Sequence, residues 1–159
     1  MEKYNTLKNR RDFKTFISEI PNYLCEITKL INKETLSYSN DEVKIVSKYF
    51  LDLHAKELFT LNEKKMLIAY IGEAFIKRYE GKWVFSAETM AVNEPVIIEY
   101  TMANIRKSPS ETIHRLFETN DENYFNWSNE YMEEMKKKTD DVFAKLFPKK
   151  TKNKSNVSD

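Results

Sequence analysis

Three side chains of this sequence could form a nucleophile and base of the cysteine and histidine type: Cys25, His54 and His114. In such a pair the imidazole removes the thiol proton, and the thiolate attacks the substrate. Cys25 lies in the segment YLCEIT, beside a helical apolar stripe where thiols are usually unreactive packing groups. The chain also lacks GxSxG, HExxH and glycine-rich phosphate-binding motifs, and it has only 2 glycines. We therefore predict no catalytic residue and no cofactor.

Glu111 and His114 form an E-x-x-H pair, a spacing that places both side chains on one face of a helix, as in di-iron bundles. A di-iron site needs a second such pair and two further glutamates on other helices. The second pair is absent from this sequence, and Glu111 lies where it would cap a helix. We therefore predict no metal site.

Glu73 is the carboxylate with the most unusual surroundings, because Met66, Ala69 and Ile76 would share its helical face. A carboxylate on an apolar face must be paired or have a raised pKa. Two interpretations stay open. Glu73 is either an acid, base or partner-binding anchor, or a structural group paired with a nearby lysine, the Trp83 indole or the backbone.

The periodicity of the apolar residues predicts a mainly helical α+β fold with about five helices. The helices are expected at residues 12–33, 39–57, 62–79, 108–120 and 121–147. Pro21 should kink or divide the first helix. Ser39 and Glu42 should form a capping box at the start of the second helix, and Asn62 should cap the third. Gly81 should end the third helix in a left-handed conformation. The sequence Ser108-Pro109-Ser110-Glu111 is a strong helix start, with a proline at the first helical position.

The third helix is the expected centre of the fold, because it has apolar residues on two opposite faces and must be covered on both. Gly72 costs roughly 1 kcal/mol relative to Ala inside a helix, so we expect another backbone to approach it closely. Two strands, at 82–86 and 95–100, should form a small two-stranded or slightly larger antiparallel sheet. Residues 1–147 should be a single globular domain, and 148–159 a disordered basic tail.

The charge and hydropathy of the chain limit the functions that it can have. The formal net charge is +1, so no overall field draws the protein to a polyanion or a membrane. No segment approaches the roughly 20 apolar residues needed to span a bilayer, and the N-terminus lacks the apolar stretch of a signal peptide. A single cysteine suits a reducing compartment. These features predict a cytoplasmic protein with no membrane partner.

One aromatic stripe on the last helix has two interpretations. Tyr124, Trp127, Tyr131 and Met135 recur at helical spacing and are most simply part of the core. If exposed, they would form a protein-binding hot spot. Partner-binding candidates are therefore Glu73, Tyr124, Trp127 and Tyr131.

The segments YIGEAFIKRYEGKWVFS and NEPVIIEY, followed by SPSETIHRLF, resemble small, largely uncharacterised bacterial domains. In those domains a helix with the pattern Y-[LI]-G-E precedes a short strand pair and a closing helix. The matching positions here are Tyr70, Gly72, Glu73, Arg78, Gly81, Trp83 and Pro95. The resemblance covers about 50 residues. Some proteins of this appearance look like immunity or accessory proteins of bacterial toxin systems, which implies a protein partner and no catalytic residues.

The leading hypothesis is a non-catalytic, immunity-type protein that neutralises a cognate toxin by direct binding. One alternative is a small enzyme or ligand-binding domain that uses Glu73 with His54 or His114 in a pocket. A second alternative is a nucleic-acid-binding accessory protein that uses Lys136–Lys138 and the basic tail. Neighbouring acids largely neutralise Lys136–Lys138, so nucleic-acid binding is the weaker alternative.

Overall fold

The computed structural model describes residues 6–85, 95–99 and 106–148. Within these ranges the chain forms α1 (Arg10–Leu30), α2 (Asn40–Ala55), α3 (Leu61–Tyr79), β1 (Gly81–Phe85), β2 (Pro95–Glu99), β3 (Arg106–Lys107), α4 (Pro109–Thr119) and α5 (Tyr124–Leu146). The mainly helical character predicted from the sequence is confirmed. The expected disordered tail lies outside the described residues, apart from Pro148.

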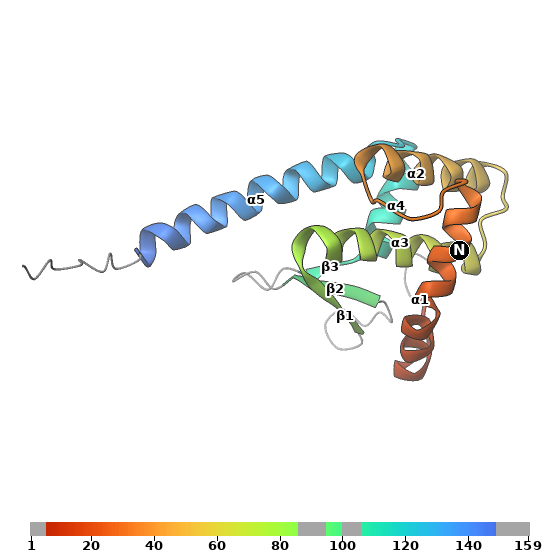
Figure 1. The fold of residues 1–159 in the computed structure, drawn as a ribbon, viewed down its shortest axis with the longest axis horizontal. Coiled ribbons are helices and arrows are strands. Elements are labelled where there is room, and N and C mark those ends of the chain that lie inside the picture. The colour runs from red at the N-terminus through yellow and green to blue at the C-terminus, as the bar shows by residue number, and fades with distance from the viewer. Residues whose placement is uncertain (1–5, 86–94, 100–105, 149–159) are drawn as a thin grey trace, which may run out of the picture.

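Helix α3 is the centre of the fold. It contacts α1, α4, β1 and β2, and Figure 1 shows it lying along the sheet. Leu67, Ile71 and Phe75 are buried on one face, and Met66 and Ala69 are buried on the opposite face. The prediction that this helix is covered on both sides is therefore confirmed.

The strands form a three-stranded antiparallel sheet in the order β1-β2-β3. Trp83 of β1 is opposite Ile97 of β2, and Ile98 of β2 is opposite Arg106 of β3. β1 follows α3 directly, so the chain reverses at the end of the central helix. This places Trp83 back against α3, where the candidate site begins.

Two helix starts follow the predicted capping chemistry. The Ser39 side chain accepts a hydrogen bond from the Glu42 backbone nitrogen at 3.3 Å, and Ser108 does the same for Glu111 at 3.3 Å. Pro109 occupies the start of α4, where its missing N–H leaves no intrahelical bond unmade. These local signals were sufficient because each one satisfies a donor within the same turn.

Two predictions about helix ends are wrong. Thr60, rather than Asn62, caps α3, because Thr60 and Glu63 satisfy each other's backbone donors in a capping box. The left-handed residue that ends α3 is Glu80, with φ 56°, and Gly81 already belongs to β1. Pro21 does not divide α1, which is one continuous helix with buried side chains on both sides of the proline, so of the two predicted effects of Pro21 only a kink remains.

None of the helices in the described ranges combines the length and apolar character that crossing a membrane requires.

Candidate functional site

Glu73 is paired with Trp83. The Trp83 Nε1 group donates a hydrogen bond to Glu73 Oε1 at 2.7 Å, and the carboxylate is half-buried. This contact is the indole pairing that one of the two sequence interpretations expected. It joins the middle of α3 to β1, so it fixes the direction in which the sheet leaves the central helix.

The same indole explains Gly72. A Cβ atom added at Gly72 would overlap Cη2 and Cζ2 of Trp83 and lie 3.0 Å from Cζ3. The close approach is therefore by a side chain, and the expectation of a neighbouring backbone is wrong. Phe16 packs edge-on against the indole with ring centroids 5.4 Å apart, so the ring is held between α1 and α3.

The histidines have other partners. His54 stacks on Phe117 with ring centroids 4.1 Å apart, and His114 Nε2 lies 2.8 Å from Glu118 Oε1. Neither contact involves Glu73, so these contacts do not assemble the glutamate and histidine pair of the enzyme hypothesis. Cys25 is exposed on α1, which corrects the expectation that it packs beside the core.

In the ranges that the structure describes, histidine, cysteine and acidic side chains form no group of three or more that could hold a metal ion.

A buried carboxylate that the sequence reasoning missed lies at the start of α2. Glu42 is only 4% exposed. Its Oε2 accepts from the Ser37 backbone nitrogen and hydroxyl, both at 2.8 Å, and its Oε1 accepts from the Tyr38 nitrogen and the Tyr70 hydroxyl, both at 2.9 Å. A carboxylate has about four acceptor positions. Protein donors occupy all four, which leaves none for a substrate.

The pKa values of Glu42, Tyr38 and Tyr70 follow from burial and hydrogen bonding. Burial opposes ionisation of Glu42, but the hydrogen bonds from Ser37, Tyr38 and Tyr70 outweigh it and lower the pKa of the carboxyl. Burial, followed by the charges of Glu73 and Glu42, raises the pKa of Tyr38 to about 12. Burial and the neighbouring Glu42 raise the pKa of Tyr70. At neutral pH the cluster therefore holds one anion and two neutral phenols.

Two cations at the end of α3 complete this arrangement. Arg78 Nη2 donates to the Tyr38 carbonyl at 3.0 Å and to Asn40 Oδ1 at 2.8 Å, and Lys77 Nζ donates to the Ser37 carbonyl at 3.3 Å. Tyr38 has φ 55°, an uncommon conformation for a bulky residue. We call Ser37, Tyr38, Glu42, Tyr70 and Arg78 the Glu42 cluster. It ties the connection between α1 and α2 to α3, and its contacts are structural.

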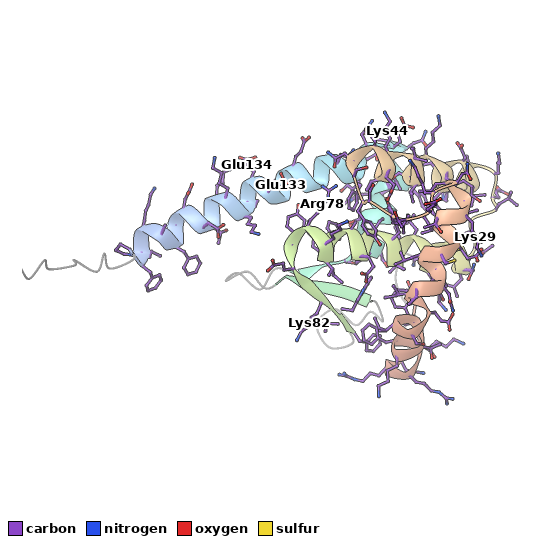
Figure 2. All side chains as sticks on the ribbon, in the orientation of Figure 1. Lys29, Lys44, Arg78, Lys82, Glu133 and Glu134 are labelled. Atoms are coloured by element: carbon purple, nitrogen blue, oxygen red, sulfur yellow. The ribbon has the colours of Figure 1, made fainter. Side chains whose placement is uncertain are left out.

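Among the described residues, the first turns of α5 anchor it to the body. Phe125 is 1% exposed and packs on Phe75 with ring centroids 5.1 Å apart. Just before the helix, Glu122 pairs with Lys44 at 3.1 Å. Beyond these turns Figure 1 shows α5 projecting away from the rest of the protein, and Figure 2 shows Glu133 and Glu134 on this projecting part.

The projecting part exposes an apolar face. We call residues 130–147 the α5 arm. Its exposed large apolar side chains are Tyr131, Met135, Val142, Leu146 and Phe147, and Tyr131 is 62% exposed. Tyr124 is half-buried, whereas Tyr131 and Met135 are exposed, so the prediction of a core stripe is wrong for those two. Trp127 belongs to α5, but its side chain lies outside the described residues.

The exposed face continues the buried one. Eighteen residues make five helical turns, so Val142 and Phe143 lie directly above Tyr124 and Phe125 on the helix surface. The body covers this face at Tyr124 and Phe125, whereas Val142 is 53% exposed. That side of the helix therefore carries apolar residues near its beginning and along the arm, and the body covers its beginning.

Comparison with known proteins gives no relative: no family model, no curated protein and no solved structure matches this chain. The fold and the site together define a mainly helical α+β body with a projecting amphipathic helix.

Proposed function

We propose that this protein acts without catalysis by binding another protein, and that the apolar face of the α5 arm is the contact surface. The observation that carries the proposal is the exposure of Tyr131, Met135, Val142, Leu146 and Phe147 along one side of a helix that projects from the body.

Single exposed apolar residues are normal on protein surfaces. Here Tyr131, Met135, Val142 and Leu146 follow the helical repeat over about 22 Å, at 1.5 Å per residue, and Phe147 is exposed directly after them. Contiguous exposed apolar surface of this kind marks an interaction site. In proteins, most of the stability of a helix comes from packing of its apolar face. A partner would supply the packing that the body gives to the other helices.

The charges on the arm support a protein partner over a nucleic acid. The acids Glu133, Glu134, Asp140 and Asp141 alternate with the lysines of the arm, and Glu134 lies 2.6 Å from Lys138. A surface that binds the phosphate backbone concentrates positive charge on one face. The arm has mixed charge, which is typical of the polar rim of a protein interface.

The narrower form of the proposal is an immunity-type role in the cytoplasm, in which the partner is a cognate bacterial toxin. The resemblance of the Tyr70–Trp83 region to immunity and accessory proteins supports this form. A protein that blocks a toxin by covering it needs no reactive group. The paired Glu73 and the saturated Glu42 fit that requirement.

Co-purification with the product of the neighbouring gene tests the proposal. The test variant is Met135→Glu, on the exposed face of the arm, and the matched control is Ile45→Glu, on an exposed site of α2. We expect the natural chain and the control to bind the partner and to protect cells that express it. Met135→Glu should weaken binding about 30-fold or more, as loss of a hot spot does.

A folded Met135→Glu variant that binds its partner as tightly as the natural chain would contradict the α5 arm as the contact surface. Turnover of a small molecule by the natural chain, lost in Glu73→Gln without loss of folding, would contradict the non-catalytic role.

A further inference from the structure

We infer that the α5 arm binds a second copy of this chain, and that the two arms pair in antiparallel orientation. This inference rests on the proposed protein-binding role of the arm, and it makes a second copy, in place of a cognate toxin, the occupant of that surface. It follows from the spacing of the apolar side chains and from the order of the charges beside them.

The apolar spacing is symmetrical about the middle of the arm. Tyr131 and Leu146 are equally far in sequence from the midpoint between residues 138 and 139. Met135 and Val142 are also equally far from it. In an antiparallel pair centred on this point, Tyr131 would lie at the height of Leu146 from the second copy. Met135 would lie at the height of Val142. A two-fold axis repeats each contact, so the apolar side chains cover each other on both sides of the midpoint.

The charges beside this face give the orientation. One flank of the apolar stripe carries four charged residues: Glu130, Glu134, Asp141 and Lys145. They share this flank because neighbouring members of the set are four or seven residues apart, which is close to one or two helical turns. In an antiparallel pair, equivalent flanks of the two helices face each other. At 1.5 Å per residue, Lys145 of the second copy would then lie about 3 Å in height from both Glu130 and Glu134.

Asp141 completes the pattern, since in the same register it lies close in height to Lys137 and Lys138 of the second copy. These lysines also meet each other at the two-fold axis, where the two Asp141 carboxylates offset their charge. In a parallel pair, this flank would instead face the other flank of the second copy, so Lys145 would not lie beside Glu130 or Glu134. The opposite charges therefore favour the antiparallel arrangement.

In the ranges that the structure describes, these apolar side chains remain exposed. Residues 149–159, which follow the arm, contain Val157 as their one large apolar residue. A segment with a single apolar side chain cannot cover the five on the arm. A second α5 arm supplies a matching number of apolar groups at the matching spacing.

Sedimentation velocity of the full chain tests the inference. We expect the natural chain to sediment as a dimer of twice 19.0 kDa. Met135→Glu should weaken the dimer at least 30-fold, whereas Ile45→Glu, an equally polar change on the exposed face of α2, should leave it intact.

Charge reversal tests the orientation. Lys145→Glu would place a third acid beside Glu130 and Glu134 and should weaken the dimer about tenfold. Combining it with Glu130→Lys and Glu134→Lys should restore much of the affinity. A parallel pair would show no such restoration, because Lys145 would not lie near these glutamates.

The outcomes separate this inference from the proposed function. A natural chain that remains at 19.0 kDa overturns the second-copy inference. If Met135→Glu then still abolishes binding of a different protein, the protein-binding role stands and the arm belongs to that partner. If Met135→Glu changes neither dimerisation nor the binding of a different protein, both proposals fail. A dimer that survives Met135→Glu also overturns the inference, because another surface then joins the copies.

Discussion

Helices α3 and α5 both carry large apolar residues at helical spacing along their length, yet only α3 is covered. Four elements surround α3, and its apolar side chains are buried on both faces. The body covers α5 only at its first turns, and Val142 and Leu146 near its end are exposed. The difference teaches that spacing predicts a helix and its apolar side, whereas the number of neighbouring elements decides whether that side is core or contact surface.

The polar groups differ in the same way. In the body, Glu42 and Glu73 accept hydrogen bonds from donors in other elements, and these bonds hold elements together. On the arm, Glu134 pairs with Lys138 within the same helix and remains exposed. Such exposed pairs contribute only about 0.3–0.5 kcal/mol. The body therefore uses its charges as structure, and the arm keeps its charges available to a partner.

A matched pair of valines gives the largest expected contrast. Val43 is 1% exposed and Val142 is 53% exposed. Val43→Lys buries an unpaired charge in the core and should lower the free energy of unfolding by about 4 kcal/mol or more. Val142→Lys should change it by less than about 0.5 kcal/mol. Urea denaturation monitored by circular dichroism, at a concentration where the chain is monomeric, measures both.

Equal destabilisation by the two valine substitutions would contradict the comparison, since it would mean that the arm is packed as tightly as the body.

Glu42→Gln tests the paired carboxylate of the body. An amide in place of the carboxylate loses charge-assisted hydrogen bonds and leaves buried donors unsatisfied, so we expect a loss of about 3 kcal/mol. Glu134→Gln on the arm is the control and should cost less than about 0.5 kcal/mol. Chemical denaturation at pH 7 measures both losses. A cost for Glu42→Gln as small as that of the control would show that the cluster does not hold the α1 to α2 connection.

The Glu42 carboxylate also predicts a pH dependence. Its pKa is lowered in the folded protein. A lowered pKa means that the stabilisation is complete above the unfolded pKa of about 4.3 and is lost as the pH falls through the folded pKa. Stability should therefore decline below pH 4.3 more steeply in the natural chain than in Glu42→Gln. Parallel pH profiles for the two proteins would contradict this assignment.

Gly72→Ala has the smallest of these effects on the body. The added Cβ would overlap the Trp83 ring, and the ring is held by Glu73 and Phe16, so it cannot simply rotate away. We expect a loss of about 2 kcal/mol despite the better helix propensity of Ala. In a Trp83→Phe background, which removes the overlapping part of the indole, Ala should become neutral or stabilising. A double-mutant cycle in urea measures the coupling. A stabilising Gly72→Ala in the natural background would sink this explanation.

Much of the local structure could be predicted from the sequence. Ser39 and Ser108 begin helices as their spacing to Glu42 and Glu111 indicated, and the two-sided pattern of the third helix correctly indicated a central element. The errors at Asn62 and Gly81 were shifts of one or two residues. They arose because neighbouring residues compete for the same cap, and small differences in geometry decide between them.

The candidate site was less predictable. Glu73 was singled out because its setting was unusual, and the Trp83 indole was among the partners considered. The Glu42 cluster was missed, because Tyr70 lies 28 residues along the chain from Glu42 and no local pattern joins them. From the sequence alone, a glutamate at a helix start is interpreted as a capping residue. Only the fold shows that the Glu42 carboxylate is buried.

By itself, the sequence determined the properties that arise within a few residues: where the helices form, where two of them begin, which of their sides are apolar and which charges lie next to each other. Hydrogen bonds within one turn and the repeat of 3.6 residues fix these properties locally. Only the tertiary structure decided that the indole of Trp83 fills the space above Gly72, that Glu42 is saturated by donors, and that the apolar side of α5 is uncovered. These three features depend on which distant elements pack together. A side chain is buried only when other elements cover it, so no segment determines its own burial.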